Sequence, residues 1–387
     1  MHRTAAPGEL TAKRVRWRGA GDGGNSAVQF SIATIADDAA LRRLARENPM
    51  QGQISLSLER EPSYFAAAAI EGSEHHTIIA TENGRIICAG SVSTRVRYIN
   101  GRPMRIGYLG GLRLDASARN RTSVIRRGYE MFHRLHDEQG GPPLYLTSIV
   151  ADNRPARRLL ERGLAGMPTY RFLGEFVTLI IPRRRPAFAS FINSGMSAGP
   201  LTVPQALLAR DQPQYQFAPA WTDEDMRSSG LAAQDFRIAR SADGAPIACA
   251  ALWDQRCFKQ TVVRGYAPFL RALRPLINAS ASLHGRPRLP GMGQPISHAF
   301  ASHMATDPHQ PNVTQTLIRL LQQSAQSRGI DYLTVGFDAR DPRLTHLRRA
   351  FHPREYVSRL YAVHWDDGAS IAEQLDDRFL APEVALL

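Results

Sequence analysis

The sequence predicts an α/β fold, in the wide sense that includes α+β, made of two tandem copies of one domain. A hairpin, a helix, a strand and a second helix occur twice in the same order, which is typical of a duplicated unit. Asn83-Gly84 and Asp243-Gly244 each separate two strand-like runs. Such dipeptides favour hairpin turns because both turn positions tolerate a positive φ. Later in each copy a Tyr-Leu-Thr run opens a strand ahead of a helix, at 145–147 and at 332–334.

The length and composition exclude several classes of protein. The chain has 387 residues, 43% of them hydrophobic, which is enough for two or three domains with packed cores. No apolar run reaches the roughly 18 residues of a membrane span, so we expect no membrane partner. Segment 1–27 carries Arg14, Arg16 and Arg18 among glycines and has no apolar stretch of the kind found in signal peptides. We expect a flexible basic tail there and a cytoplasmic protein.

Cysteine and histidine usage gives no sign of a metal site. The cysteines Cys88, Cys249 and Cys257 are too few for a disulfide framework and lack the spacing of metal ligands. The histidines His298, His303 and His309 also fit no recognised ligand set, so packed or solvated side chains are the simpler interpretation. We therefore expect no metal cofactor.

The net charge of +13 comes almost entirely from arginine, since Lys13 and Lys259 are the only lysines. Such a balance is compatible with nucleic acid, an anionic cofactor or acidic partners, and equally with the arginine bias of a GC-rich genome. The sequence has no basic stripe interleaved with aromatic residues and no zinc-finger spacing. These absences argue against nucleic acid as a partner.

Spacing of the apolar residues gives the elements of the first copy. Asp37 or Asp38 is the N-cap of a helix whose inner face carries Leu41 and Leu44, and Gly163 ends a later helix. In chain order we expect strand 28–35, helix 37–46, a short helix after Pro62, hairpin 78–80 with 85–94, strand 104–114, helix 122–138, strand 144–150, helix 155–163 and two closing strands between 169 and 181.

The Pro/Arg-rich and Ser/Gly-rich stretch 183–200 is the expected linker between a first domain, 28–182, and a second domain, 201–387. The second copy is longer between its hairpin and its Tyr-Leu-Thr run, and the difference maps onto an insertion at 258–294. We expect a helix at 266–277 inside that insertion, then strand 296–304, helix 312–328 and terminal strands 356–365 and 379–387.

Residues 112–124 lead from the end of a strand into a helix and form the strongest candidate site. A helix N-terminus offers free N–H groups and a positive dipole end, which suit a pyrophosphate. Arg119 and Arg121 add charge-assisted hydrogen bonds. An ordinary strand-to-helix turn with solvated arginines is the alternative.

Two sequence elements resemble the GNAT superfamily of N-acetyltransferases, including its tandem-domain bacterial members. Leu112, Leu114 and Arg119 match the strand and loop that hold acetyl-CoA in that family, whereas Thr122 and Val124 stand where glycine or alanine is usual. The run from Asn153 through Ala156, Leu159 and Leu160 to Gly163 is similar to the family's next helix, with the glycine one position early.

The resemblance implies two acyl-CoA N-acyltransferase-like domains, each a mixed, mostly antiparallel, twisted sheet flanked by helices. Its strands 104–114 and 144–150 would splay apart to seat the pantetheine arm of acetyl-CoA or another acyl-CoA. Asn153 would donate to that arm, or would serve only as an N-cap. The implied cofactor-binding residues are Leu112, Arg113, Leu114, Arg119, Asn120, Arg121, Thr122, Ser123 and Asn153.

The family's usual catalytic groups are missing from their expected positions. Leu160 stands where a tyrosine often protonates the departing thiolate, and Leu109 or Gly110 stands where a carboxylate is common. The remaining candidates for proton transfer are side chains that could equally be structural: Glu59, Glu61, Tyr108 and Tyr170.

The second copy has a different strand-to-helix join, at 305–312. Asp307 lies there and would repel phosphate, and Arg340 replaces Asn153 in the aligned position. We expect a degenerate copy that kept the fold without the cofactor site and that shapes the acceptor pocket. Segments 48–65 and 258–294 would contact the acceptor.

These observations favour an N-acetyltransferase, or N-acyltransferase, that transfers an acyl group from coenzyme A to a primary amine. One alternative is a non-catalytic module that binds an acyl-CoA or a protein. Another is an aminoacyl transferase that uses charged RNA. A homodimer is compatible with each of them.

Overall fold

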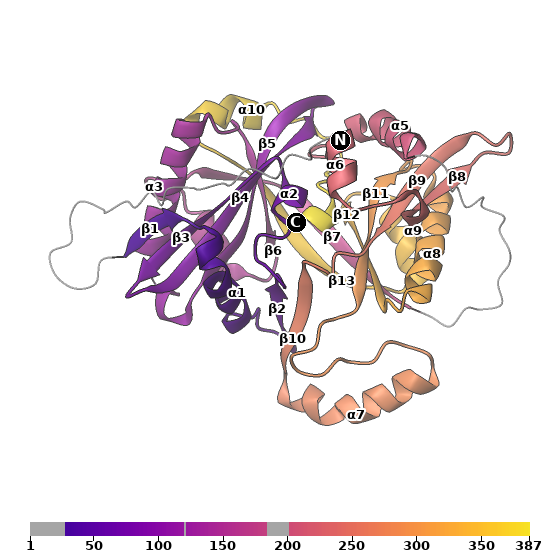
Figure 1. Ribbon diagram of the computed structural model, residues 1–387. Coiled ribbons are helices and arrows are strands. Elements are labelled where there is room, and N and C mark those ends of the chain that lie inside the picture. Colours follow the sequence, from indigo (N-terminus) through magenta and orange to yellow (C-terminus); the bar gives the residue numbers. More distant parts are fainter. Residues whose placement is uncertain (1–27, 120, 184–200) are drawn as a thin grey trace, which may run out of the picture.

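The computed structural model describes residues 28–119, 121–183 and 201–387. The expected basic tail at 1–27, Asn120 and all of the expected linker except Arg183 lie outside the described residues. The expected mixed, mostly antiparallel sheet flanked by helices is confirmed (Figure 1).

The main sheet has eleven strands in the order β1-β3-β4-β5-β6-β13-β7-β12-β11-β9-β8. Only β5–β6 and β11–β12 are parallel pairs in this sheet. The strands from the first half are β1 (Gln29–Ile32), β3 (Glu74–Glu82), β4 (Arg85–Ile99), β5 (Arg102–Leu114), β6 (Tyr145–Val150) and β7 (Thr169–Pro182). Those from the second half are β8 (Phe236–Arg240), β9 (Pro246–Trp253), β11 (His298–Ala305), β12 (Tyr332–Asp338) and β13 (Arg354–His364).

Tight turns join the hairpins where the sequence predicts them. Asn83 and Gly84 between β3 and β4 have φ of 50° and 74°, and Asn100 and Gly101 between β4 and β5 have 49° and 78°. These left-handed conformations explain the two Asn-Gly pairs. The turn between β8 and β9 differs, because in its Asp-Gly pair only Gly244, at 86°, has a positive φ.

Helices cover the sheet. The predicted helix start at Thr122 is confirmed, and Gly140 ends this helix in the left-handed conformation. No helix in the described ranges is long and apolar enough to cross a membrane. The helices are α1 (Asp38–Glu47), α2 (Ala68–Glu71), α3 (Thr122–Gln139), α4 (Arg154–Leu160), α5 (Thr202–Asp211), α6 (Asp223–Ser228), α7 (Pro268–Leu283), α8 (Pro311–Ser327), α9 (Arg343–Phe351) and α10 (Ala369–Glu373).

The two halves exchange their last strands. The two closing strands expected between 169 and 181 are wrong, because β7 is one continuous strand. It pairs with β12 of the second half from Pro182↔Tyr332 to Phe176↔Asp338. Strand β13, from the second half, lies between β6 and β7 and pairs with both. The halves therefore form one continuous sheet.

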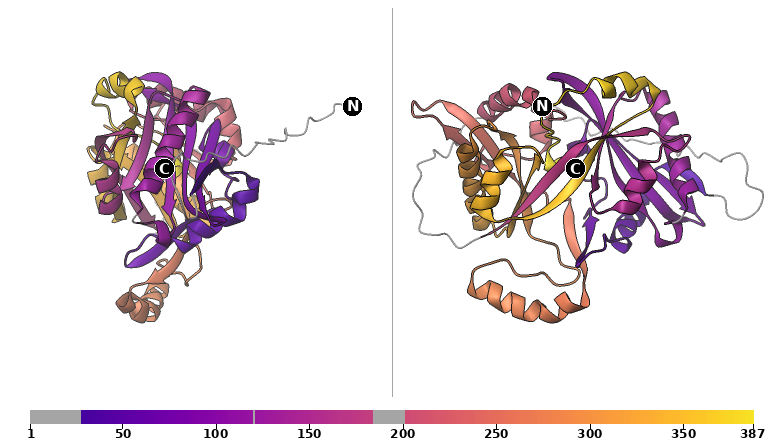
Figure 2. Two further views of the ribbon diagram at one scale, coloured as in Figure 1. Left: turned by 90° about the vertical axis from the view of Figure 1, so that its left-hand side faces the viewer. Right: turned by 180° about the vertical axis from the view of Figure 1, so that it is seen from behind.

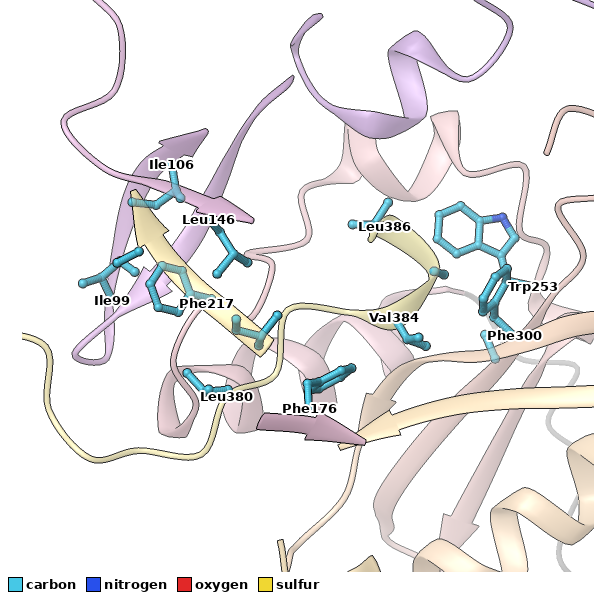
Figure 3. Packing of buried hydrophobic residues seen from close by; sticks show 14 of the residues in the cluster. Ile99, Ile106, Leu146, Phe176, Phe217, Trp253, Phe300, Leu380, Val384 and Leu386 are labelled. Atoms are coloured by element: carbon cyan, nitrogen blue, oxygen red, sulfur yellow. The ribbon is translucent and has the colours of Figure 1, made fainter. Parts of the chain in front are cut away.

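One hydrophobic core also serves both halves. Ile106 and Leu146 from the first half and Trp253 and Phe300 from the second belong to the same buried cluster (Figure 3). Leu386, near the end of the chain, joins it. The terminal strand expected at 379–387 is wrong, because this segment has only an isolated bridge at Leu380 and a short 3₁₀ turn over Val384–Leu386.

A second, two-stranded sheet connects the halves on one side. Strand β2 (Ile54–Glu59) of the first half pairs with β10 (Gln260–Tyr266) of the expected insertion. The predicted helix of the insertion is present, but it begins at Pro268 and continues to Leu283. Helix α7 extends away from the main sheet (Figures 1 and 2). The two segments expected to meet the acceptor therefore pair with one another.

The strand exchange predicts that the halves do not fold independently. A fragment ending at residue 200 lacks β13, which leaves long edges of β6 and β7 unpaired and opens the shared core. We expect this fragment to show no cooperative urea unfolding transition, and co-expression with residues 201–387 to restore one. A cooperative transition in the isolated fragment would contradict this expectation.

Candidate functional site

Strands β5 and β6 diverge and leave a wedge between them. They pair at only three positions, from Gly107↔Tyr145 to Leu109↔Thr147, although β5 continues to Leu114 and β6 to Val150. Thr147 Oγ1 donates to the Leu109 carbonyl at 2.7 Å, where the pairing ends. Residues 110–114 therefore have no ladder partner in β6, and their polar backbone edge faces the wedge.

A β-bulge lies at the mouth of this wedge. Ser91 of β4 pairs with Gly110, and Ala89 pairs with Arg113, so Gly111 and Leu112 together oppose a single residue of β4. Gly111 has φ of 65°, a conformation that favours glycine. The bulge changes the direction of the backbone at the point where β5 leaves β6.

The same bulge occurs at the equivalent place in the second copy. Ala251 of β9 pairs with Ser302, and Cys249 pairs with Ala305. His303, with φ of 48°, takes the position of Gly111. Its backbone N–H donates to a carboxylate oxygen of Glu383 at 2.9 Å. In the second copy the chain itself therefore supplies a carboxyl oxygen to the bulge.

The wedge of the second copy is filled by residues 380–386. The Leu380 N–H donates to Asp338 at 2.8 Å, and Val384 and Leu386 pack into the shared core (Figure 3). Beside them remains a cavity of about 60 Å³ whose lining includes Phe176, Tyr215, Val335, Arg343 and Glu383. That volume accommodates a few water molecules.

The strand-to-helix joins of the two copies also differ. In the second copy, the carboxylate of Asp307 accepts from the His309 N–H at 2.8 Å and from the Gln310 side chain at 3.1 Å, just ahead of α8. Arg340, which aligns with Asn153, is paired with Asp338 at 2.9 Å. A carboxylate thus occupies the place that corresponds to the predicted phosphate site of the first copy.

In the first copy the join is a 3₁₀ turn, η2 (Ala116–Ala118), followed by α3. Asp115 caps this turn, and the hydrogen bond from the Ser117 N–H lowers the pKa of Asp115 to about 2. Val124 is only 2% exposed and packs beside Ala118 in a small core to which Leu112 and Leu114 also contribute. The side chain of Val124 therefore replaces the family's small residue inside the core.

The two arginines of the loop have partners in the first half. Arg121 donates to both carboxylate oxygens of Glu82, at 3.0 and 2.9 Å. Arg119 lies 3.4 Å from the side-chain oxygen of Asn48. A phosphate bound here would therefore compete with Glu82 for Arg121. Thr122 and Ser123 form the first turn of α3, and Asn120 lies outside the described residues.

Asn153 caps α4, and its side-chain oxygen accepts from the Ala156 N–H at 3.3 Å. Asn153 therefore serves as an N-cap, which is one of the two roles that the sequence analysis considered for it; the other is cofactor binding. Arg113 lies on β5 directly after the bulge and donates to the Leu112 carbonyl at 3.0 Å. Burial, with a smaller contribution from the nearby Arg60, lowers the pKa of Arg113.

Three of the four candidate proton-transfer residues have contacts away from the wedge. Glu59 is buried and binds Arg264 of β10 at 2.8 Å. Glu61 pairs with Arg42 and Arg46 of α1, at 2.5 and 2.7 Å. These contacts attach the β2–β10 ribbon to the first half.

The two tyrosines differ in position. The Tyr170 hydroxyl contacts that of Tyr129, and burial raises the pKa of Tyr170. Tyr108, by contrast, lies on β5 where the wedge opens, with its hydroxyl 3.0 Å from Ser148 Oγ of β6. Burial raises the pKa of Tyr108 to about 12, so it carries its proton at neutral pH.

A hydrogen-bonded chain of side chains reaches the bulge on the face of the sheet that also carries Tyr108. His75 Nε2 lies 3.3 Å from Thr77 Oγ1, which lies 3.0 Å from Ser91 Oγ, which lies 3.1 Å from the Tyr64 hydroxyl. A β-carbon placed on Gly111 would be 3.7 Å from that hydroxyl. The chain therefore ends beside the bulge.

Glu71 anchors the far end of this chain. Its carboxylate lies 3.1 Å from His75 Nδ1 and 2.5 Å from Arg60. Burial alone would raise the pKa of Glu71, but the charge of Arg60 and the contact with His75 outweigh burial and lower it to about 2. Glu71 is therefore ionised, and one of its carboxylate oxygens lies close to the imidazole.

The sequence analysis missed this chain of residues. Its signal is the alternation of His75 and Thr77 on one face of β3, opposite Ser91 of β4. It becomes visible only once the register Thr77↔Ser91 is known.

From the second half, Lys259 lies near Arg60 and Glu71. Burial lowers the pKa of Lys259 to about 8, and its amine donates to the Ala385 and Leu387 carbonyl groups.

The described parts of the chain contain no cluster of three or more His, Cys, Asp or Glu side chains that could hold a metal ion. The contacts that converge on the wedge are instead backbone groups, hydroxyls and the His75–Glu71 pair. Such groups can bind an extended polar ligand and transfer protons.

The chain matches no model of a known protein family and no curated protein by sequence. Its structure is similar to that of Saccharomyces cerevisiae N-myristoyltransferase with bound myristoyl-CoA, with a TM-score of 0.55 and 11% identity over 94% of this chain and 87% of that chain. A second structure of the yeast enzyme with myristoyl-CoA gives 0.54 and 10% over 92% and 85%.

The chain therefore has the tandem GNAT fold of N-myristoyltransferase, and the fold implied by the sequence resemblance is confirmed. Identity at this level establishes the fold alone. The low identity also explains why only short motifs carried the resemblance in the sequence.

The buried Glu383 predicts a pH-dependent contribution to stability. Burial raises its pKa to about 7, against opposing contributions from the His303 N–H and from Arg97 and Arg95. A raised carboxyl pKa stabilises the fold below the unfolded value, and this contribution is lost as the pH rises through 7. Relative to Glu383→Gln, we expect the wild type to lose about 3 kcal/mol of unfolding free energy between pH 5 and pH 8.

Urea unfolding at both pH values measures this difference. Glutamine keeps an acceptor for the His303 N–H, so the comparison isolates the charge. Parallel pH profiles for the two proteins would show that Glu383 does not titrate in this range.

Proposed function

We propose that this protein is an acyltransferase that moves an acetyl or longer acyl group from coenzyme A to a primary amine. The contrast between the two copies carries the proposal. Both have the same bulge beside the same divergence of parallel strands. In the second copy Glu383 binds the His303 N–H and residues 380–386 fill the wedge. In the first copy the equivalent residue, Gly111, is exposed where β5 and β6 stop pairing.

The Glu383 carboxylate indicates which ligand atom the bulge of the first copy would bind. An N–H that holds a carboxyl oxygen in one copy is placed to hold a thioester carbonyl oxygen in the other. There it would stabilise the negative charge that develops when an amine attacks. The similar yeast structures hold myristoyl-CoA, a thioester of this class.

The rest of the cofactor would follow β5 into the loop at 115–123. The unpaired edge of residues 110–114 would bind the amides of the pantetheine arm. The N-terminus of α3, with Arg119 and Arg121, would hold the pyrophosphate. Val124 leaves this position open because its side chain lies in the core.

The chain from Tyr64 to His75 supplies a route for the proton that the amine loses. As the C–N bond forms, the hydroxyls of Tyr64, Ser91 and Thr77 would pass this proton to His75 Nε2, while Glu71 holds the opposite ring nitrogen. The C–S bond breaks and coenzyme A leaves as a thiolate. Tyr108, protonated at neutral pH, lies at the wedge to protonate it.

Removal of the loop arginines tests the cofactor site. We expect Arg119→Ala/Arg121→Ala to weaken coenzyme A binding by about 10- to 100-fold, because two charge-assisted contacts to phosphate are lost. Titration calorimetry with coenzyme A and with acyl-CoAs of increasing chain length measures this change and the preferred donor. Arg126→Ala, one turn further along α3 and paired with Glu130, is the matched control. Equal affinities in all three proteins would place the cofactor elsewhere.

Substitution of His75 tests the chemistry. We expect His75→Gln to lower kcat for thiol release by about 10²- to 10⁴-fold with coenzyme A affinity unchanged, because the proton acceptor is lost. The assay combines the preferred acyl-CoA with a panel of primary amines. His76→Gln is the matched control, since neighbouring side chains on a strand lie on opposite faces. A wild-type protein that binds acyl-CoA but releases no thiol with any amine would indicate a binding module.

A further inference from the structure

Helix α7 and the loop that follows it, residues 268–294, form an arm that the proposed chemistry does not use. The arm leaves the body of the molecule through β10 and lies apart from the main sheet in all three views (Figures 1 and 2). Of the α7 residues, only Ala281 is buried. Packing against the core of the protein therefore does not explain the apolar residues of this helix.

The outward face of α7 is apolar and exposed. Phe269, Leu276 and Leu283 recur every seven residues and are 76%, 69% and 75% exposed. Seven residues complete nearly two helical turns, so these side chains form one stripe along the helix. In the described residues only five large hydrophobic side chains are more than half exposed, and four of them, these three and Met292, lie in the arm.

The opposite face of α7 is occupied by the arm's own loop. The Asn278 side chain exchanges hydrogen bonds with the backbone of Leu289, at 2.7 and 3.1 Å. Arg274 donates to the same carbonyl at 3.3 Å, and Arg286 donates its N–H to the Ala281 carbonyl at 2.8 Å. This packing fixes the rotation of the helix and keeps the apolar stripe turned outward.

The arm is also strongly basic. From 255 to 306 the sequence has seven Lys and Arg residues and no Asp or Glu. Three of the arginines, Arg271, Arg286 and Arg288, are exposed on the arm itself. An arm that combines an apolar helical stripe with four arginines and no acidic residue is complementary to a lipid surface with negative charge.

We propose that α7 docks the protein onto an anionic lipid bilayer, with Phe269, Leu276 and Leu283 in the interface and with the net positive charge of the arm attracting the anionic headgroups. This is peripheral attachment, which is distinct from crossing the bilayer. The inference goes beyond the proposed acyl transfer and does not rest on it.

Co-sedimentation of the full chain with lipid vesicles tests the proposal. We expect wild-type protein to bind phosphatidylcholine vesicles that contain phosphatidylglycerol. Binding should be at least about tenfold weaker to vesicles of phosphatidylcholine alone, or in about 0.5 M NaCl, because the arginines are then screened or unpartnered. Phe269→Ser/Leu276→Ser/Leu283→Ser should reduce binding to the anionic vesicles by about tenfold or more, since the apolar stripe is lost.

Ile35→Ser is the matched control, because Ile35 is 74% exposed and lies in the first half, outside the arm. It should bind vesicles as the wild type does. The triple variant should keep the wild-type melting temperature, since its three side chains contact water. Arg271→Gln/Arg286→Gln/Arg288→Gln should lose the preference for anionic vesicles.

Three results would overturn the proposal. The first is wild-type protein that does not sediment with anionic vesicles at low salt. The second is a triple serine variant that binds them as tightly as the wild type does. The third is a wild-type dimer that the triple variant converts to a monomer in light scattering, which would make the stripe a contact between two copies of the chain. The vesicle assay contains no coenzyme A and no amine, so its outcome is independent of the proposed function.

Discussion

The pairing of β13 with both β6 and β7 is the interaction on which the rest of the structure depends. It joins two halves that could each have been a separate domain into one sheet and places residues of both in one core. Leu360 of β13 packs in the same cluster as Leu146 and Phe300. The exchange also fixes the two wedges relative to one another. Strand β6 belongs to the first wedge and β12 to the second, and the exchanged strands β13 and β7 lie between them.

Both halves have the same divergence of strands and the same bulge, but their residues at the bulge differ in a way that has chemical consequences. Gly111 leaves the first bulge without a side chain. His303 occupies the second and brings Glu383 to its backbone N–H. In the second copy Glu383 and residues 380–386 fill the wedge. In the first copy the equivalent residue at the bulge, Gly111, is exposed. The filled wedge of the second copy can therefore be compared directly with the wedge of the first copy in the same molecule.

Much of the local structure could be predicted from the sequence. The Asn83-Gly84 hairpin, the start of α3 at Thr122 and the divergence of β5 from β6 all agree with expectation. The candidate site was predicted less completely. Glu59 and Glu61 are tied to arginines of the β2–β10 ribbon and α1, whereas the chain from Tyr64 to His75 was not anticipated. Glu59 and Glu61 were candidates because of their residue type alone. A proton path depends also on strand register, which the sequence does not determine.

The sequence by itself determined the features that depend on neighbouring residues: turns where asparagine and glycine tolerate positive φ, helix starts and ends, and the basic loop before α3. The tertiary structure alone decided the strand exchange, the filling of the second wedge by residues 380–386 and the outward stripe of α7. Each of these depends on contacts between segments far apart in the chain, or on which helix face the protein leaves uncovered. Local propensity cannot encode such contacts, because the free energy that selects them comes from burial in the assembled fold.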